Sequence, residues 1–380
     1  MNYYHYIFTG AGAAGLSLLT RMIESGKFRD KQILVVDSSS KQTNDRTWCF
    51  WEKEPGYFDH LIHKRYNKLW FHSKDYSSLN DITPYTYKLL RGIDFYNYCL
   101  SVIRSQPNII WREDKVDGVH SQNNHSWINI GDEEIHAEYI FNSIVFEKPT
   151  LKDGQVYMLQ HFMGWVIEAD QDRFNEGEAT FMDFRVDQID GSCFVYVMPF
   201  SSRRALVEFT IFGPSAWNDE QYEIQLTQYI RQYLGLHHYN VLDKEKGVIP
   251  MTSYNYPLFE GGIVNIGTAG GQTKASSGYT FQFIQKQSVK IIDSLDKIGN
   301  PYYDENVLNR RFALYDHTLL NILNGNKLQG AEIFRDLFQR NKMTDVLKFL
   351  DNETNIGEEL KIFSTLPSKQ FIRAALDELF

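Results

Sequence analysis

The chain has 380 residues, a formal net charge of −9 and an aromatic content of 15%. Acidic and basic residues are mixed along it, which excludes the basic face of a protein that binds a nucleic-acid backbone. The three cysteines are far apart without a CxxC pair, so we expect neither a disulfide framework nor a metal site, and a reducing, cytoplasmic setting fits best. We see no secretion signal and no apolar run near the ~18 residues of a membrane span, so we do not expect an integral membrane protein.

The first predicted elements form a nucleotide-binding unit. An apolar strand over residues 4–9 leads into a glycine turn and then a helix with apolar residues at helical spacing. Gly10, Gly12 and Gly15 make the pattern G-x-G-x-x-G, whose glycines allow a tight turn, close approach of a pyrophosphate and close helix packing. A second buried-type strand ends at Asp37, where an acid can bind a ribose hydroxyl. Order and spacing predict a Rossmann-like dinucleotide site.

The next segments favour FAD over a nicotinamide cofactor as the bound dinucleotide. After Asp37 the chain enters an aromatic, strand-like stretch, "NDRTWCFWEKEPGYFDHLIHKRYNKLWFHS", instead of further βα units. A second glycine-rich element follows at residues 261–295, where a strand over 263–266 precedes "GTAGG" and a helix. Long insertions between two such elements are typical of two-domain FAD proteins. Many flavin hydroxylases carry Gly-Asp where this chain has Gly267 and Thr268.

The middle of the chain predicts an antiparallel meander. Alternating strand runs cover residues 180–186, 193–200 and 205–212, with turns between them. On the third run Glu208 shares one face with Leu206 and Phe212, whereas Phe209 lies on the other face. Glu208 is either at a half-exposed edge or is a buried acid kept for chemistry, and a sheet that covers a flavin favours the second explanation.

The last segment, from about residue 298, has apolar residues at helical spacing and predicts a helical lobe. We interpret these residues as packing core in preference to a membrane-binding face. The predicted fold is thus α/β (α+β), a two-domain flavoprotein of the hydroxylase type. Its parts are a discontinuous FAD-binding domain (1–60, 95–148 and 246–297), a substrate-binding antiparallel sheet domain (61–94 and 149–245) and a helical C-terminal lobe (298–380).

Several longer motifs point to one family. They are "GAGAAGLSL", "DRTWCFW", "QHFMGWVIEAD", "MDFR", "FVYVMPFS", "ALVEFT", "GVIPMT" and "IGTAGGQTKASSGYTF", and they extend along most of the chain. With these motifs the chain resembles lycopene β-cyclases of the FAD-dependent bacterial and plant type.

The resemblance implies a reaction without net redox change. The end group of lycopene is protonated, the tertiary cation is attacked by the next alkene, and loss of a ring proton gives a β-ionone ring, so that γ-carotene and then β-carotene form. The family needs reduced FAD, with NAD(P)H as the expected electron donor.

The resemblance also assigns roles to residues. The essential carboxylate of the family falls on Glu208, and Phe209 stands where the family often has Asp or Tyr. We expect the substrate to contact Trp48, Trp51, Tyr196, Phe209 and Tyr279, although core packing explains the two tryptophans equally well. Asp183 and Arg185 are expected to pair with each other, with a catalytic role as the alternative. The expected cofactor contacts are Gly10, Gly12, Ala13, Ala14, Gly15, Asp37, Arg46, Gly267, Thr268, Gly270, Gly271 and Lys274, of which Lys274 has a solvated position as its alternative.

Other functions remain open at this point. A flavin-dependent aromatic monooxygenase would share the fold. A non-catalytic carotenoid or lipid carrier would have no use for a buried acid such as Glu208. A relative that forms ε-rings or ketocarotenoids would differ only in the geometry of its pocket. Since lycopene is a hydrocarbon, we expect the protein to associate peripherally with the inner face of the cell membrane. No nucleic-acid or protein partner is expected.

Overall fold

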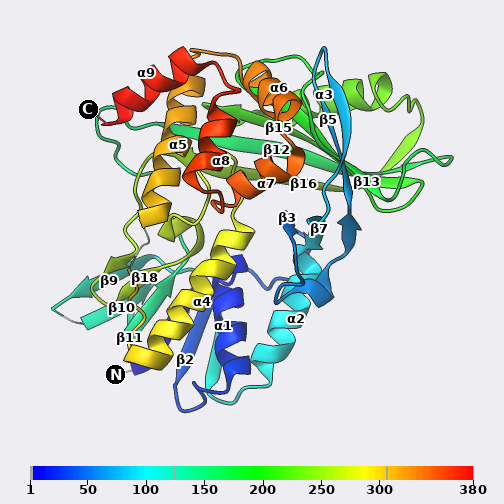
Figure 1. Ribbon diagram of the computed structural model, residues 1–380. Coiled ribbons are helices and arrows are strands. Elements are labelled where there is room, and N and C mark those ends of the chain that lie inside the picture. The colour runs from blue at the N-terminus through cyan, green and yellow to red at the C-terminus, as the bar shows by residue number, and fades with distance from the viewer. Residues whose placement is uncertain (1–2, 124, 305–306, 380) are drawn as a thin grey trace.

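The nucleotide-binding lobe is a parallel sheet covered on both faces. In this computed structural model, which describes residues 3–123, 125–304 and 307–379, the strand order is β18 (Ile263–Asn265), β11 (Glu133–Asn142), β1 (Tyr3–Thr9), β2 (Ile33–Asp37) and β8 (Ile109–Glu113). Every residue of β2 is buried, as expected for an apolar run between two covered faces. The helices α1 (Ala13–Ser25) and α4 (Phe281–Ile298) pack together on one face (Figure 1). The hairpin β9 (Gly118–Gln122) and β10 (His125–Ile130) contributes to the core on the other face.

The second lobe is a large, mostly antiparallel sheet. Its order is β16 (Tyr239–Thr252), β12 (Tyr157–Ala169), β15 (Arg204–Gly213), β14 (Ser192–Pro199), β13 (Glu178–Asp183), β5 (Lys68–His72) and β6 (Ser77–Asp81). The predicted meander is present as β13, β14 and β15. The two-domain flavoprotein fold predicted from the sequence is therefore confirmed.

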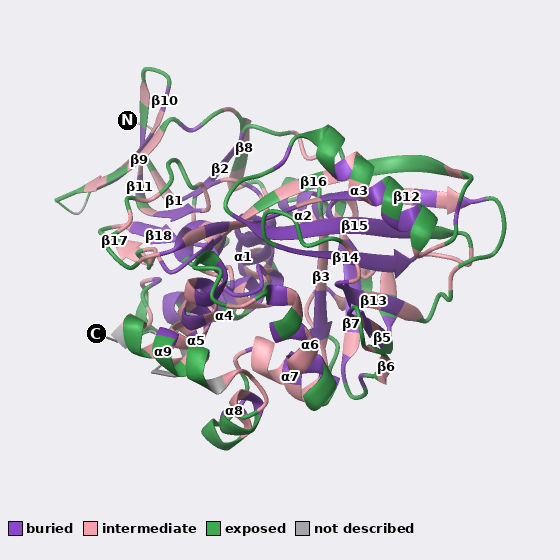
Figure 2. Ribbon diagram, turned by 90° about the horizontal axis from the view of Figure 1, so that it is seen from above, coloured by how far each residue is buried: buried purple, intermediate pink, exposed green. Residues whose placement is uncertain are grey.

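The two faces of the large sheet have different covers. The helix α3 (Asp219–Gln232) packs on one face, and the C-terminal helices pack on the other, so β14 and β15 are buried between them (Figure 2). The C-terminal residues Leu347 and Ile362 are buried in this core, whereas Ile372 and Leu376 are 61% and 49% exposed. The predicted helical lobe consists of α5 (Val307–Asn324), α6 (Gly330–Arg340), α7 (Met343–Leu350), α8 (Ile356–Phe363) and α9 (Ser368–Leu379).

A small sheet connects the two lobes. It contains β3 (Thr47–Glu52), β7 (Thr86–Arg91) and β4 (Lys64–Tyr66), and the helix α2 (Gly92–Arg104) follows it. The short elements η1 (Asp59–Leu61), β17 (Phe259–Glu260) and η2 (Gly267–Gly270) complete the described chain. The predicted domain bounds cut through three elements: residue 60 falls inside η1, residue 95 inside α2 and residue 246 inside β16. The first bound also assigns β3 and its partner β7 to different domains. Residues 246–252 pair with β12 and so belong to the large sheet.

Each helix in the described part of the chain is too short or too polar to cross a bilayer. Within the same residues, no cluster of histidine, cysteine or acidic side chains has the arrangement of a metal site.

Asp183 and Arg185 form the expected ion pair at the end of β13. The Asp183 side chain is fully buried, and Arg185 donates to both carboxylate oxygens, at 2.9 Å and 2.6 Å. The hydroxyl of Tyr229, from α3, donates to the same carboxylate at 2.8 Å. The carboxylate thus fixes α3 against the sheet.

Replacing this carboxylate tests its structural role. We expect Asp183→Ala to lower the free energy of unfolding by about 3 kcal/mol, because Arg185 and Tyr229 lose their shared acceptor. Asp187→Ala, at an exposed site four residues away, should stay within about 0.5 kcal/mol of the parent. Urea unfolding followed by fluorescence measures both, and equal stability of the two variants would contradict this role.

Candidate active site

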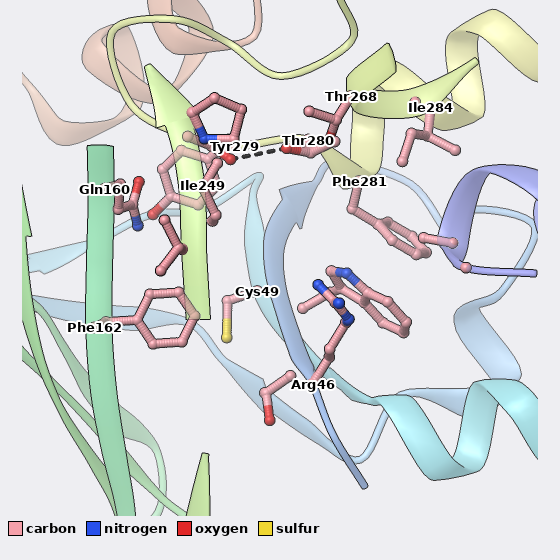
Figure 3. A pocket seen from close by; sticks show the side chains of 18 of the residues that line it. Arg46, Cys49, Gln160, Phe162, Ile249, Thr268, Tyr279, Thr280, Phe281 and Ile284 are labelled. Carbon is pink, nitrogen blue, oxygen red and sulfur yellow. Dashed lines mark hydrogen bonds between the residues drawn. The ribbon is translucent and has the colours of Figure 1, made fainter. Parts of the chain in front are cut away.

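A cavity of about 530 Å³ lies where the two lobes meet. Strands β3, β7, β12, β14, β15 and β16 line one part of it, and the start of α1, η2 and the start of α4 line the other. Gln160 and Phe162 on β12 face Phe281 and Ile284 on α4 across it, with Cys49 between them (Figure 3). The cavity has the size of a ligand pocket and contains residues from both predicted sites.

The first glycine turn leaves room for an anion at the start of α1. Gly10 has a φ of +87°, and a Cβ at Gly15 would lie 2.3 Å from the carbonyl oxygen of Gly10. A Cβ at Gly12 would meet no protein atom within 4 Å, and Gly12 precedes α1 without a side-chain cap. The first amides of the helix therefore face the cavity with Gly12, Ala13 and Ala14, which suits a phosphate group.

The Asp37 carboxylate stabilises this turn through hydrogen bonds with backbone amides. Its Oδ2 accepts from the amide of Ala11 at 2.6 Å, and its Oδ1 accepts from the amide of Ser39 at 2.8 Å. Lys41 lies 3.1 Å from Oδ1 and also lines the cavity. The Asp37 carboxylate is buried and does not line the cavity wall, so the structure assigns it to the turn; its expected ribose contact stays a prediction.

The second glycine segment packs directly on the first. A Cβ on Gly267, whose φ is +59°, would lie 2.7 Å from the Cβ of Ala14, so only a glycine allows this approach. Gly267 and Thr268 line the cavity with the start of α1, as expected from the sequence. Gly270 and Gly271 instead line a neighbouring cavity near the C-terminal helices.

Lys274 does not face the cavity, contrary to its expected cofactor contact. Its ammonium group is buried and donates to both carboxylate oxygens of Asp316, at 2.8 Å and 3.0 Å, and to Asn352 at 2.8 Å. The same Asp316 accepts from Ser276. Lys274 therefore connects the glycine segment to α5 and is not solvated either.

Glu208 projects into the cavity from the middle of β15. Its side chain is 9% exposed, which rules out the half-exposed edge as its explanation. Thr210 donates a hydrogen bond to its Oε1 at 2.9 Å, and Tyr196 is its direct cross-strand neighbour on β14. Burial among apolar side chains raises the pKa of Glu208 well above its ordinary value, and a second carboxyl group adds to this shift.

That second carboxyl group belongs to Glu245 on β16, which the sequence analysis did not identify. Gly164 on the intervening strand β12 is the cross-strand partner of both Glu208 and Glu245. A Cβ on Gly164 would lie 3.1 Å from Cγ of Glu245, so the glycine leaves the space in which the two carboxyl groups form a hydrogen bond. Burial raises the pKa of Glu245 too, and Thr47 donates to its Oε2 at 2.6 Å.

The aromatic side chains expected to contact the substrate are divided between the cavity and the core. Trp48, Tyr196 and Tyr279 line the cavity. Trp51 lies behind Tyr279, with ring centroids 4.7 Å apart, and donates from Nε1 to the carbonyl of Leu347, so core packing explains it. Phe209 was expected in the pocket but is fully buried on the opposite face of β15, where it stacks on Trp217. Strand alternation separates Phe209 from its neighbour Glu208.

Buried polar atoms in the cavity wall indicate that its ligand has polar groups. Gln160 Oε1 and Ser277 Oγ are buried without a hydrogen-bond partner. A pure hydrocarbon cannot offset the cost of burying them, whereas a flavin ring with carbonyl and imino groups can. The exposed guanidinium of Arg46 lines the cavity at the same end as Trp48. These residues fit a flavin nucleotide.

The space above Gly12 gives a direct test of cofactor binding. Gly12→Asp places a favoured N-cap residue before α1 but puts a negative charge where the phosphate would lie. We expect unchanged or slightly higher stability and a loss of FAD affinity of roughly a thousandfold, from about 4 kcal/mol of repulsion at ~4 Å.

Gly12→Asn, of almost the same size but neutral, is the matched control and should lose much less affinity. Titration of the cofactor-free protein with FAD, followed by flavin fluorescence, measures both. Equal affinities of the two variants would show that no phosphate lies there.

Comparisons with known proteins agree with this geometry. No curated protein sequence matches the chain. Among solved structures, a flavoprotein/dehydrogenase from Cytophaga hutchinsonii superposes with a TM-score of 0.62 at 14% identity, covering 99% of both chains. A geranylgeranyl bacteriochlorophyll reductase-like protein from Thermoplasma acidophilum gives 0.59 at 10% identity, covering 100% of both chains. A p-nitrophenol 4-monooxygenase from Pseudomonas putida gives 0.58 at 13% identity, covering 100% of this chain and 98% of its own.

These likenesses concern the fold alone. The match that concerns the family is the one described as "Lycopene cyclase protein", which extends over residues 6–376. It includes both glycine segments, the meander with Glu208 and the C-terminal helices. The chain belongs to the lycopene cyclase family.

Proposed function

We propose that the protein is a lycopene β-cyclase, an FAD-dependent isomerase that converts the linear end groups of lycopene to β-ionone rings. The observation that carries this proposal is the buried carboxyl group of Glu208 in the wall of an aromatic cavity, between the large sheet and a nucleotide-binding lobe. A carrier or a purely structural sheet gains nothing from a buried acid, whose burial costs several kcal/mol of folding free energy.

Glu208 is suited to give and take a proton. Because its pKa is raised, the carboxyl group keeps its proton to a higher pH than an exposed glutamate does and loses it as the pH rises through the folded-state pKa. Transfer of that proton to the terminal alkene yields a tertiary cation, the next alkene closes the ring, and a ring proton leaves. The side chains of Tyr196, Phe162 and Trp48 line the cavity and present aromatic surfaces that attract a cation.

Gly12, Ala13, Ala14, Arg46, Gly267 and Thr268 are the residues that would hold FAD in this cavity. When bound and reduced by NAD(P)H, the flavin supplies negative charge beside the cation without being consumed. The unpartnered groups of Gln160 and Ser277 support its position at the cavity wall.

Pigment analysis tests the proposed reaction. In a bacterial host that accumulates lycopene, the unchanged chain should produce β-carotene by way of γ-carotene. We expect Glu208→Gln to lower product formation by about 10²–10⁴-fold, the usual contribution of general acid–base catalysis. Glu138→Gln, at an exposed site, should leave it unchanged.

Intact lycopene in the presence of the folded, flavin-bound chain would refute the cyclase. Consumption of NAD(P)H and oxygen in proportion to an oxygenated product would instead support the alternative, a flavin-dependent aromatic monooxygenase.

We further propose that the enzyme takes lycopene from the inner face of the cell membrane. Exposed apolar side chains lie at the cavity: Val145 and Val248 line it and are 38% and 50% exposed, and the adjacent Phe146 is 43% exposed. A hydrocarbon that leaves a bilayer at these side chains enters the cavity without crossing water. A second apolar surface lies on α8, where Ile356 and Leu360 are 60% and 63% exposed.

Charge substitutions show which of the two apolar surfaces contacts the membrane. We expect the double variant Phe146→Asp and Val248→Asp to sediment with anionic phospholipid vesicles at least 10-fold less than the parent, because each buried side chain contributes about 1.5–3 kcal/mol. The double variant Ile356→Asp and Leu360→Asp is the comparison and should bind nearly as well as the parent. The reverse result would place the contact on α8, and no binding by the parent would refute membrane association.

A further inference from the structure

We infer that Glu208 and Glu245 work as one acid–base pair that holds a single proton, with Glu245 as the residue that positions and stores it. This inference rests on the proposed function for its chemical steps. Glu208 reaches the cavity, whereas Glu245 acts through Glu208 and is a positioning residue.

The strand register brings the two carboxyl groups together. Both lie opposite Gly164, on either side of β12, so their side chains lean toward each other over the only position in that row without a Cβ. Glu245 Oε1 lies above Gly164, 3.4 Å from where a Cβ would stand. The hydroxyl of Thr210 donates a hydrogen bond to Oε1 of Glu208, and the hydroxyl of Thr47 donates one to Oε2 of Glu245. The remaining oxygens are left for the contact between the carboxyl groups, which requires one proton.

The groups around the pair do not neutralise it. Cys49, Tyr196 and Tyr279 surround Glu208 as neutral groups, since burial raises the pKa of each of them. Asp45 and Asp243 lie near Glu245 and add negative charge.

The nearest lysines of β16 are directed elsewhere. Lys244 and Lys246 flank Glu245 in the sequence, but strand alternation turns both to the other face, where they pair with Glu223 and Asp219 near α3. The pair therefore carries one negative charge when it holds its proton and two when the proton has left.

This pair can both donate and recover the one proton that the reaction requires. Glu208 gives its proton to the terminal alkene carbon, and the alkene electrons form the new C–H bond. The cation then lies beside two carboxylates whose mutual repulsion favours taking a proton back. After ring closure, the electrons of the ring C–H bond form the new double bond and the proton returns to Glu208. Substrate and product are isomers, and the pair ends in its starting state.

Infrared titration of the flavin-bound chain tests the shared proton without any turnover. With ¹³C-labelled glutamate, the carboxylic acid C=O band of the pair should persist at neutral pH in the parent and be absent in Glu208→Gln. In Glu245→Gln the volume and the Thr47 contact are kept, but the neighbouring negative charge is gone. We expect the midpoint of the Glu208 band to fall by about one pH unit or more, because a like charge raises the pKa of its neighbour.

Gly164→Ala provides a second, independent separation of the pair. Its methyl group would lie 2.9 Å from Leu206 Cδ1 and 3.1 Å from Glu245 Cγ, which forces the carboxyl groups apart. The midpoint should again fall, with the fold checked by circular dichroism. Unchanged midpoints in both variants would overturn the inference.

Pigment formation then links the pair to the reaction. The acid must be protonated, so activity is present at low pH and lost as the pH rises through the pKa of the pair. In Glu245→Gln this loss should move to lower pH by the same interval as the infrared midpoint. If the parent makes no cyclic product, the proposed function fails while the infrared result still decides the proton pair; identical pH profiles would overturn the catalytic part of the inference.

Discussion

Keeping a carboxyl group out of water is the constraint on which this active site depends. Glu208 loses its hydration inside the cavity, which raises its pKa, and a hydrogen bond from Thr210 offsets part of that loss. The surrounding wall is built accordingly: aromatic and apolar side chains from two sheets surround the acid, and no lysine from β16 reaches it. A cation formed in such a place would be stabilised by whatever negative charge the site has, because the low polarity leaves little screening.

The cavity lies at the boundary between two lobes that contribute different groups to it. The parallel sheet supplies helix amides and glycine turns for a nucleotide, and the large sheet supplies a rigid wall of alternating side chains. The contact between Gly267 and Ala14 joins the two glycine segments, which are about 250 residues apart in the chain. Similar architecture occurs in a reductase-like protein, a monooxygenase and a brominase among the solved structures, so the fold alone does not decide the reaction.

Much of this could be predicted from the sequence, because it rests on local patterns. The glycine spacing, the buried strand ending at Asp37 and the alternation around Glu208 are properties of neighbouring residues, and the structure has these elements where they were expected. The same alternation argues against a pocket position for Phe209, which was assigned from the resemblance alone. Glu245 could not be found in this way: it stands in the charged run "LDKEKG", which is typical of a solvated strand. Only the register of β15, β12 and β16 brings it to Glu208, and register between distant strands is not a local property.

The buried pair of Lys274 and Asp316 has a wider effect on the molecule. It ties the loop after η2 to α5, and Asn352, between α7 and α8, accepts from the same ammonium group. We therefore expect binding of the cofactor to be coupled to the packing of the C-terminal helices. Binding of the flavin to the nucleotide-binding lobe should protect the C-terminal helices from proteolysis. Proteolytic removal of those helices should in turn lower the affinity for the flavin, although the two regions lie at opposite ends of the chain.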